Sequence, residues 1–419
     1  MVASMLFPSR FQGTFLKTLI TAALAVFCVG FTPATAQVIP YTDPDGFYTS
    51  IPSAENTAPG TVLSQRDVPM PVLDVLVKMK RIAYTSTHPN GFSTPVTGAV
   101  LLPTAPWRGP GPRPVALLAP GTQGAGDSCA PSKLLTMGGE YEMFSAAALL
   151  NRGWTVAVTD YQGLGTPGNH TYMNRKAQGA ALLDLGRAIT TLNLPDVNNH
   201  TPIIPWGYSQ GGGASAAAAE MHRAYAPDVN VVLAYAGGVP ANLLSVSSSL
   251  EGTALTGALG YVITGMYEIY PEIREPIHNF LNTRGQVWLD QTSRDCLPES
   301  LLTMPLPDTS ILTVSGQRLT SLISDDVFQR AISEQQIGLT APDIPVFVAQ
   351  GLNDGIIPAE QARTMVNGWL SQGADVTYWE DPSPALDKLS GHIHVLASSF
   401  LPAVEWAEQR LAALGQPTP

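Results

Sequence analysis

A serine between glycines is the clearest candidate for chemistry in this sequence. The segment Gly207-Tyr208-Ser209-Gln210-Gly211 follows a short apolar run and precedes an alanine-rich stretch, which predicts a sharp turn from a strand into a helix. Such a turn strains the backbone and lifts the serine hydroxyl above the edge of a sheet, at the positive end of the helix. We therefore predict that Ser209 is a nucleophile; the alternative is an ordinary glycine-rich helix start.

A serine nucleophile needs a histidine base that an acid holds in one tautomer. In chains of this pattern the acid and then the base follow the serine. Asp354 comes directly after an apolar strand and is predicted to be the acid, although Asp354-Gly355 is also a common turn pair. His392 is predicted to be the base, on a loop before the last helix, with His394 as the alternative. The other five histidines precede Asp354 and are interpreted as surface or structural residues: His88, His170, His200, His222 and His278.

Attack by a serine on an acyl group creates an oxyanion, which needs two N–H donors. The backbone N–H of Gln210, next after the nucleophile, is predicted to be one. The glycine-rich loop 120–126 follows the apolar strand 115–119 and is predicted to supply the other, from Gln123 or Thr122. The alternative is a flexible loop with no role in the site.

The sequence gives no sign of a metal or a cofactor. No histidines and cysteines have the spacing of metal ligands. Residues 163–168 match the dinucleotide pattern G-x-G-x-x-G, but that site needs a helix that opens within the loop. Pro167-Gly168-Asn169 opposes such a helix, so we interpret this loop as a border of the active site.

Strands and helices alternate over most of the chain, which predicts an α/β fold with a mostly parallel central sheet flanked by helices. One local feature is unusual. Pro205 lies in the strand before Ser209, and because proline has no N–H we expect a bulge or an early end to pairing there. The predicted strands are 77–87, 94–102, 115–119, 155–159, 203–206, 229–236, 346–349 and 375–380, and the predicted helices are 140–152, 177–192, 212–225, 359–371 and 395–414.

The alternation stops between residues 242 and 338, where helical periodicity continues without a strong strand. We interpret these residues as a helical cap or lid inserted between two parts of the core, 37–241 and 339–419. Residues 37–75 are rich in proline and predict a strap over the domain. The apolar character of the insertion suits an acyl tunnel or an interfacial lid; plain packing against the core is the alternative.

The first 36 residues have the features of a signal peptide that is cleaved after Ala36. Arg10 and Lys17 precede and border an apolar run over 18–31, and small residues occupy 34–36. The run is too short to span a bilayer comfortably; an uncleaved anchor is the alternative. We therefore predict a secreted protein.

The mature chain is acidic. Removal of the leader deletes two positive charges and changes the formal net charge from −11 to −13, which argues against nucleic acid and anionic membranes as partners. Cys129 and Cys296 would be the two remaining cysteines, and in an oxidising compartment such a pair usually forms a disulfide. Asn169 and Asn199 lie in glycosylation sequons, which matter only in a eukaryotic source.

Taken together, these motifs resemble the secretory lipases of the lipase A type, known from yeasts and actinobacteria. The motifs that carry the resemblance are PGTVL at 59–63, PGTQG at 120–124, DSCAPS at 127–132, DYQGLG at 160–165, GYSQGG at 207–212, GLND at 351–354, GH at 391–392 and LPAVEW at 401–406.

The resemblance covers nearly all of the mature chain and implies the α/β-hydrolase fold with a helical cap over the site. It implies the triad Ser209, Asp354 and His392 and a disulfide between Cys129 and Cys296. It also implies hydrolysis of triacylglycerols and simpler esters without a cofactor. Yeast members carry an acidic residue in the loop that here contains Gln123.

The leading hypothesis is a secreted lipase or carboxylesterase that works through an acyl-enzyme. The alternatives are a short-chain carboxylesterase, an acyltransferase on the same scaffold, and an inactive binding module. We expect an ester or lipid substrate, transient contact with a lipid interface but no stable membrane anchor, and a monomer or weak dimer.

Overall fold

The computed structural model describes residues 43–69, 77–303, 306–324 and 326–414. The predicted signal peptide, with its cleavage site after Ala36, lies outside these residues.

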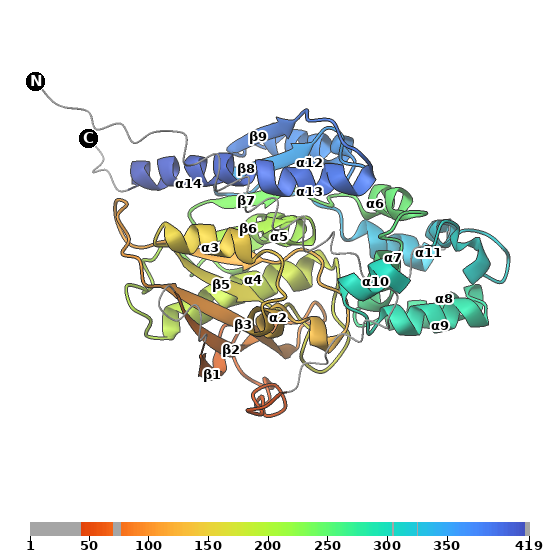
Figure 1. Ribbon diagram of the computed structural model, residues 1–419, viewed down its shortest axis with the longest axis horizontal. Coiled ribbons are helices and arrows are strands. Elements are labelled where there is room, and N and C mark those ends of the chain that lie inside the picture. The colour runs from red at the N-terminus through yellow and green to blue at the C-terminus, as the bar shows by residue number, and fades with distance from the viewer. Residues whose placement is uncertain (1–42, 70–76, 304–305, 325, 415–419) are drawn as a thin grey trace, which may run out of the picture. The chain divides into compact units, whose positions relative to one another are not determined.

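A nine-stranded sheet forms the centre of the described chain, in the order β1-β2-β3-β5-β4-β6-β7-β8-β9 (Figure 1). The first three strands pair antiparallel, and β3 pairs antiparallel with β5. From β5 to β9 all neighbours are parallel, so the predicted mostly parallel sheet is confirmed. The strands are β1 (Val62–Val68), β2 (Val77–Thr87), β3 (Ser93–Pro103), β4 (Val115–Ala119), β5 (Thr155–Thr159), β6 (Ile203–Tyr208), β7 (Ala234–Gly237), β8 (Val346–Gly351) and β9 (Val376–Asp381).

Helices cover both faces of the sheet. One core cluster joins α4, α5 and α12 to one face, and another joins α2, α3 and α14 to the other. The short strand β4 shows why its sequence is apolar throughout: Val115 and Leu117 belong to the first cluster, whereas Ala116 and Leu118 belong to the second. The α-helices of the core are α2 (Pro131–Met137), α3 (Met143–Asn151), α4 (Arg175–Thr191), α5 (Gln210–Tyr225), α12 (Ala359–Ser371), α13 (Lys388–Ser398) and α14 (Phe400–Leu414), and η1 (Asp127–Cys129) is a 3₁₀ turn.

The segment between β7 and β8 contains helices and 3₁₀ turns but, in its described residues, no strand of the sheet. Most of its buried apolar side chains form a third cluster, separate from the two that flank the sheet, and this cluster also includes Tyr172, Met173, Ile356 and Ile357 from the core segments. The elements are α6 (Leu243–Leu250), α7 (Gly257–Met266), η2 (Pro271–Ile273), α8 (Arg274–Phe280), α9 (Thr283–Thr292), α10 (Leu297–Thr303), η3 (Thr309–Leu312), η4 (Leu319–Ser324) and α11 (Asp326–Ser333).

Four sequence predictions of elements were wrong. The predicted helix 395–414 is divided between α13 and α14, which lie on either side of Ser399. Residues 37–75 were expected to form a strap without strands, yet β1 pairs with β2; as an edge strand it buries few side chains, so its hydrophobic pattern is weak. The predicted strand 229–236 is only the short β7. The predicted helix 140–152 begins at Met143 as α3, and the residues before it pack their side chains against a loop instead.

The irregularity expected at Pro205 lies on the neighbouring strand. Pairing of β6 with β4 continues through Pro205 without a register shift. On the other side Ile203 pairs with Val231, but Trp206 pairs with Tyr235. The partner segment therefore holds one more residue than β6 does, opposite the proline that has no N–H to donate.

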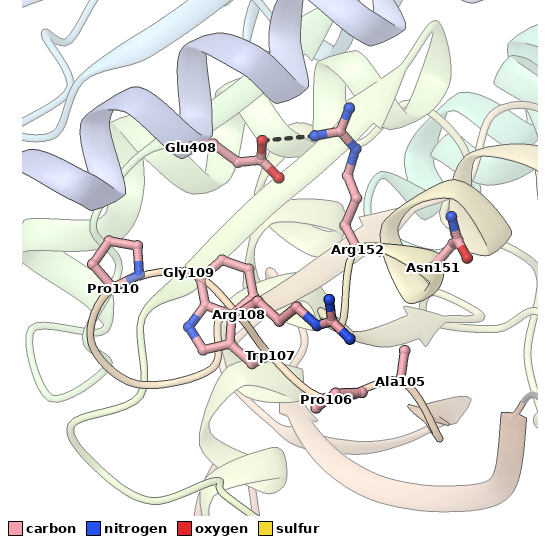
Figure 2. Close-up of a pocket in the computed structure, with 9 residues that line it drawn as sticks. All are labelled: Ala105, Pro106, Trp107, Arg108, Gly109, Pro110, Asn151, Arg152 and Glu408. Carbon is pink, nitrogen blue, oxygen red and sulfur yellow. Dashed lines mark hydrogen bonds and ion pairs between the residues drawn. The ribbon is translucent and has the colours of Figure 1, made fainter. Parts of the chain in front are cut away.

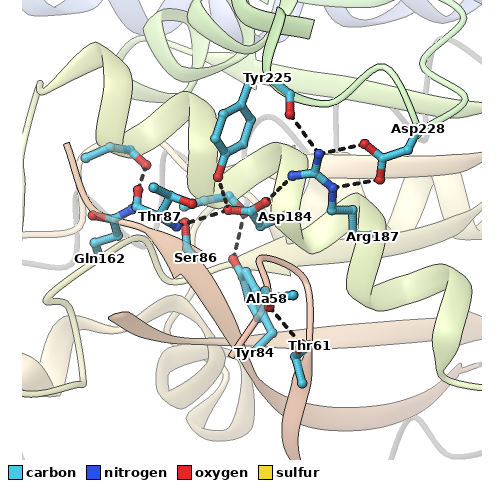
Figure 3. A network of polar contacts seen from close by, with 12 residues as sticks. Ala58, Thr61, Tyr84, Ser86, Thr87, Gln162, Asp184, Arg187, Tyr225 and Asp228 are labelled. Atoms are coloured by element: carbon cyan, nitrogen blue, oxygen red, sulfur yellow. Dashed lines mark hydrogen bonds and ion pairs between the residues drawn. The ribbon is translucent and has the colours of Figure 1, made fainter. Parts of the chain in front are cut away.

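A buried carboxylate ties α4 to the antiparallel strands and to the end of α5 (Figure 3). The Asp184 side chain is fully buried and accepts hydrogen bonds from Arg187 (2.7 Å) and from the Tyr225 hydroxyl (2.7 Å). Arg187 also pairs with Asp228 (2.6 Å), whose side chain is mostly exposed. Burial raises the pKa of Asp184, and its hydrogen bonds act in the opposite direction.

Replacing Asp184 tests this network as a stability device. Asp184→Ala leaves a half-buried guanidinium and a hydroxyl without their partner, and we expect the free energy of unfolding to fall by about 3 kcal/mol in chemical denaturation. Asp228→Ala is the matched control, because it removes the exposed partner of Arg187 and should cost below about 1 kcal/mol. Equal losses of unfolding free energy in the two variants would show that burial is not the reason for the contribution of Asp184 to stability.

Candidate active site

Ser209 occupies a strained turn between β6 and α5. Its backbone has φ 58° and ψ −121°, a left-handed φ that side chains with a Cβ rarely adopt. Neighbouring backbone leaves room only for glycine on either side. A Cβ on Gly207 would lie 2.2 Å from the Gly211 carbonyl oxygen, and one on Gly211 would lie 1.8 Å from the Ala119 carbonyl oxygen. The turn therefore has the geometry of a nucleophile elbow.

The structure brings the three predicted triad residues into one hydrogen-bonded chain. Nε2 of His392 lies 2.9 Å from the Ser209 hydroxyl, and Nδ1 lies 2.7 Å from Oδ2 of Asp354. If Nδ1 donates to the carboxylate, Nε2 is the free acceptor that a serine proton requires. Ser209 itself is half-buried.

The Asp354 carboxylate is held rigidly after β8. Its Oδ1 accepts the backbone N–H groups of Ile356 and Ile357, both at 2.9 Å, and its side chain is fully buried. One oxygen is thus fixed by the backbone while the other faces His392. The two N–H donors and the imidazole compensate for the burial of the carboxylate.

His392 lies in a helix, not in the predicted loop. The Asp387 carboxylate caps α13 by accepting a hydrogen bond from the Ser390 N–H (2.7 Å). In return the Ser390 hydroxyl oxygen accepts a hydrogen bond from the Asp387 N–H (2.8 Å). This capping box starts the helix before the histidine, which therefore sits in its second turn. The Tyr208 hydroxyl donates to the His392 carbonyl (2.7 Å), so the residue before Ser209 also fixes the helix that carries His392.

The alternative histidine points elsewhere. His394 is half-exposed and lies 3.3 Å from Asp381. Being two positions from His392 on a helix, it faces a different direction. Only His392 contacts both Asp354 and the nucleophile.

The predicted oxyanion loop lies against the elbow. A Cβ on Gly211 would approach Pro120 as well as Ala119, so the loop begins beside the first turn of α5. Gln210 is the first residue of that helix, where backbone N–H groups lack partners within the helix. Gln123 is buried, and its carboxamide donates to Glu140 (3.0 Å). Its side chain is therefore occupied, and a contribution to an oxyanion hole would come from backbone.

His170 is a buried neighbour of the site whose role the sequence did not indicate. The Gln210 side-chain Nε2 donates to Nε2 of His170 (3.0 Å), and Nδ1 of His170 lies 3.3 Å from the Gln162 carbonyl. Burial lowers the pKa of His170 to about 4, so the ring is neutral near pH 7 and can accept from Gln210. No motif around His170 in the sequence indicates that its ring contacts the Gln210 side chain.

The insertion between β7 and β8 holds the far side of the loop. The Leu297 N–H donates to the Gln123 carbonyl (2.7 Å), and the Ala125 N–H donates to the Asp295 carbonyl (3.0 Å). The predicted disulfide between Cys129 and Cys296 is present and closes the same junction. Loop and insertion are therefore joined by backbone and by a covalent bond.

A pocket of about 520 Å³ lies away from these residues (Figure 2). It is lined by the loop 105–110, the end of α3 and Glu408 of α14. Arg152 and Glu408 form an ion pair across it (2.6 Å). None of the predicted site residues lines it, so the chemistry predicted from the sequence belongs elsewhere. Within the described ranges no group of three or more histidine, cysteine or acidic side chains could hold a metal ion.

Comparison with known proteins agrees with the resemblance in the sequence. The family model described as secretory lipase matches residues 129–418. A probable inactive lipase of Mycobacterium tuberculosis is 26% identical over 386 residues, which is 90% of this chain and 83% of that protein. A secreted triacylglycerol lipase of Malassezia globosa is 25% identical over 410 residues, which is 94% of this chain and 87% of that protein.

Solved structures confirm the predicted fold. The closed state of lipase A from Candida antarctica superposes with a TM-score of 0.76 at 22% identity, covering 91% of this chain and 88% of that one. At that identity the likeness concerns the fold alone, which is the α/β-hydrolase fold.

Removing the disulfide should loosen the junction of loop and insertion. For Cys129→Ser/Cys296→Ser we expect a loss of about 2–5 kcal/mol in the free energy of unfolding, measured by urea denaturation. Reduced wild-type protein should show the same loss. An unchanged denaturation midpoint would mean that the backbone contacts alone hold this junction.

Proposed function

Because the chain belongs to the secretory lipase family, we propose that it hydrolyses carboxylic esters through a triad of Ser209, His392 and Asp354. The observation that carries the proposal is the unbroken hydrogen-bond chain from the Ser209 hydroxyl through His392 to Asp354, at 2.9 and 2.7 Å. A serine on a strained turn, a base within reach and an acid that orients the base are the parts that acyl transfer needs.

In the first half of the reaction Ser209 becomes acylated. His392 Nε2 takes the serine proton as the hydroxyl oxygen attacks the ester carbonyl carbon, and a tetrahedral oxyanion forms. The same proton then passes from Nε2 to the leaving alcohol, and the ester C–O bond breaks. Asp354 stays ionised and stabilises the transient imidazolium through Nδ1.

In the second half water replaces the alcohol. His392 takes a proton from the water, the resulting hydroxide attacks the acyl carbon, and the proton returns to the Ser209 oxygen as the acid leaves. The backbone N–H of Gln210 and one from Thr122 or Gln123 would stabilise both oxyanions. Loss of one such donor typically costs about 10²- to 10³-fold in kcat.

The contacts of His392 and the backbone of Ser209 argue against the alternative of an inactive binding module. One relative is named a probable inactive lipase, so membership of the family does not by itself imply catalysis. In this chain the base touches both the serine and the acid. A serine held at a positive φ of 58° is strained, and such strain is expected where a side chain must be presented for chemistry.

We further propose that the substrate is a triacylglycerol met at a lipid surface. A relative is named a secreted triacylglycerol lipase. Leu352, Leu386 and Ile393 are exposed on the two segments that carry the acid and the base. The Asn353 side chain joins these segments by donating to the Ser383 carbonyl (2.9 Å). Apolar side chains exposed on the segments that carry the proposed acid and base suit contact with a lipid surface.

The segment 242–338 is proposed to act as a cap. Its elements supply most of the third apolar cluster, and Leu297 contacts the oxyanion loop directly. A cap of this kind would bind the acyl chain by burying its methylene groups. Movement of such a cap would set access to Ser209.

Secretion is also proposed. The relative from Malassezia globosa is named as secreted, and a disulfide between Cys129 and Cys296 is typical of an oxidising compartment. No helix in the described ranges combines the length and apolar character needed to cross a bilayer.

Loss of the nucleophile should abolish hydrolysis. For Ser209→Ala we expect kcat/KM on p-nitrophenyl butyrate to fall by about 10⁴- to 10⁶-fold with no change in fold, because the oxyanion hole and binding alone remain. Ser215→Ala is the matched control: this serine lies in α5, the helix that follows Ser209, and its hydroxyl donates to the Tyr235 carbonyl (2.7 Å). A fluorophosphonate should label the wild type and the control only. Retained activity in Ser209→Ala would refute the triad.

The acyl-chain profile separates a lipase from a short-chain esterase. We expect hydrolysis of both tributyrin and emulsified triolein, measured as released acid, because the insertion is rich in apolar side chains. Leu386→Ser should slow triolein hydrolysis and leave p-nitrophenyl butyrate unaffected, since Leu386 is 97% exposed. A steep loss of rate beyond short chains would favour a carboxylesterase, and transfer onto added alcohol in preference to water would favour an acyltransferase.

A further inference from the structure

Three consecutive residues before α3 contact three consecutive residues of the oxyanion loop. The Gly121 N–H donates to Glu142 (2.6 Å), and the Gln123 carboxamide donates to Glu140 (3.0 Å). Between them the Tyr141 hydroxyl donates to the Thr122 carbonyl (3.3 Å). We call residues 140–142 the loop clamp.

The clamp leaves both predicted oxyanion donors of the loop unused. The N–H groups of Gly121 and Ala125 have partners, as do the carbonyls of Thr122 and Gln123. Among the described residues, the N–H groups of Thr122 and Gln123 have no hydrogen-bond acceptor. These are the two groups from which an oxyanion donor was predicted, so the contacts fix the loop while keeping its donors free.

Contact is tight as well as polar. A Cβ on Gly121 would lie 2.5 Å from the Tyr141 hydroxyl and 2.8 Å from a carboxylate oxygen of Glu142. It would also lie 3.4 Å from the Tyr208 carbonyl, which belongs to the elbow. Gly121 is therefore packed between the clamp and the residue that precedes the nucleophile.

Two buried carboxyl groups in this place need an explanation. Glu140 and Glu142 are both buried, and among the described residues neither forms an ion pair with lysine or arginine. One oxygen of Glu140 is buried with no hydrogen-bond partner among those residues. Unpaired buried carboxylates are costly, and the same loop contacts could be made by neutral amides. Two buried carboxyl groups that bind one loop are expected where the position of that loop is important for function.

We propose that Glu140 and Glu142 are positioning residues that hold the oxyanion loop in its catalytic geometry through Gln123 and Gly121. This inference rests on the proposed function, because it assumes that the loop supplies an oxyanion donor. It predicts an effect on kcat with little effect on KM, since the oxyanion exists only along the reaction path.

Protonation of the pair should set how firmly it holds the loop. Burial raises the pKa of Glu140 to about 7, and burial with the nearby Glu140 raises the pKa of Glu142 well above its usual range. Both groups therefore keep protons that an unfolded chain loses near pH 4.5. The titratable groups facing them are the hydroxyls of Tyr141, Tyr161 and Tyr235, which do not neutralise a negative charge. The state in which both carboxyl groups are protonated is therefore lost as pH rises, first through about 7 for Glu140 and then above it for Glu142.

The test compares truncation with isosteric replacement. Glu142→Ala removes the acceptor of the Gly121 N–H, and we expect kcat on p-nitrophenyl butyrate to fall about 10- to 100-fold, with KM within about twofold of wild type. Glu142→Gln keeps an acceptor oxygen and should restore kcat towards the wild-type value. Glu140 still ionises at about pH 7 in this variant, so the first decline of kcat should remain, whereas the further decline that ionisation of Glu142 causes at higher pH should be absent.

Asp184→Ala is the matched control, since it truncates another buried carboxylate outside the site; it should lower the thermal midpoint without lowering kcat. A wild-type kcat in a folded Glu142→Ala protein would overturn the inference. If that variant does not fold, Glu142→Gln decides: an alkaline profile identical to wild type would overturn the inference, and an extended one would support it. Ser209→Ala keeps the two proposals apart, because activity in that variant would refute the triad, whereas inactivity there with full kcat in Glu142→Ala would refute only the clamp.

Discussion

The close approach of α5 to the ends of its neighbouring strands is the constraint on which the rest of the site depends. A Cβ on Gly211 would lie 1.8 Å from the Ala119 carbonyl oxygen of β4, and one on Gly212 would lie 2.0 Å from the Gly237 carbonyl oxygen of β7. Helix and strands can meet at these distances only where side chains are absent. The chain must then turn within Ser209, whose positive φ follows from that closeness.

From this point the parallel sheet places the other groups. Because parallel strands present their carboxyl ends at one edge, the residues after β4, β6 and β8 meet there. That edge gathers the loop after Ala119, the turn at Ser209 and Asp354, the proposed acid. His392 arrives from α13 after β9, held by the Tyr208 hydroxyl. Strand pairing thus brings Ser209 and Asp354 together, and the helix that follows β9 adds His392.

Much of this arrangement could be predicted because its signals are local. β2 and β4 have the predicted bounds, and the order of Ser209, Asp354 and His392 gives the triad its candidates. Other features depend on contacts across the fold. The helix around His392 begins early because of one capping box. Glu140 and Glu142 looked like ordinary first residues of a helix, and only the loop they contact, 17 and 21 residues away in sequence, gives them meaning.

The insertion departs from β7 and returns at β8, and these strands are direct neighbours, with Ala234 paired to Val346. Its two ends are therefore brought together by the sheet whatever lies between them. Closing a chain segment costs entropy that grows only with the logarithm of its length, about 0.6 kcal/mol for each doubling. The insertion can thus lengthen or shorten during evolution at little thermodynamic cost, provided that the segment around Cys296 still reaches the loop 120–126. The length of the insertion and the geometry around Ser209 can in this way change independently.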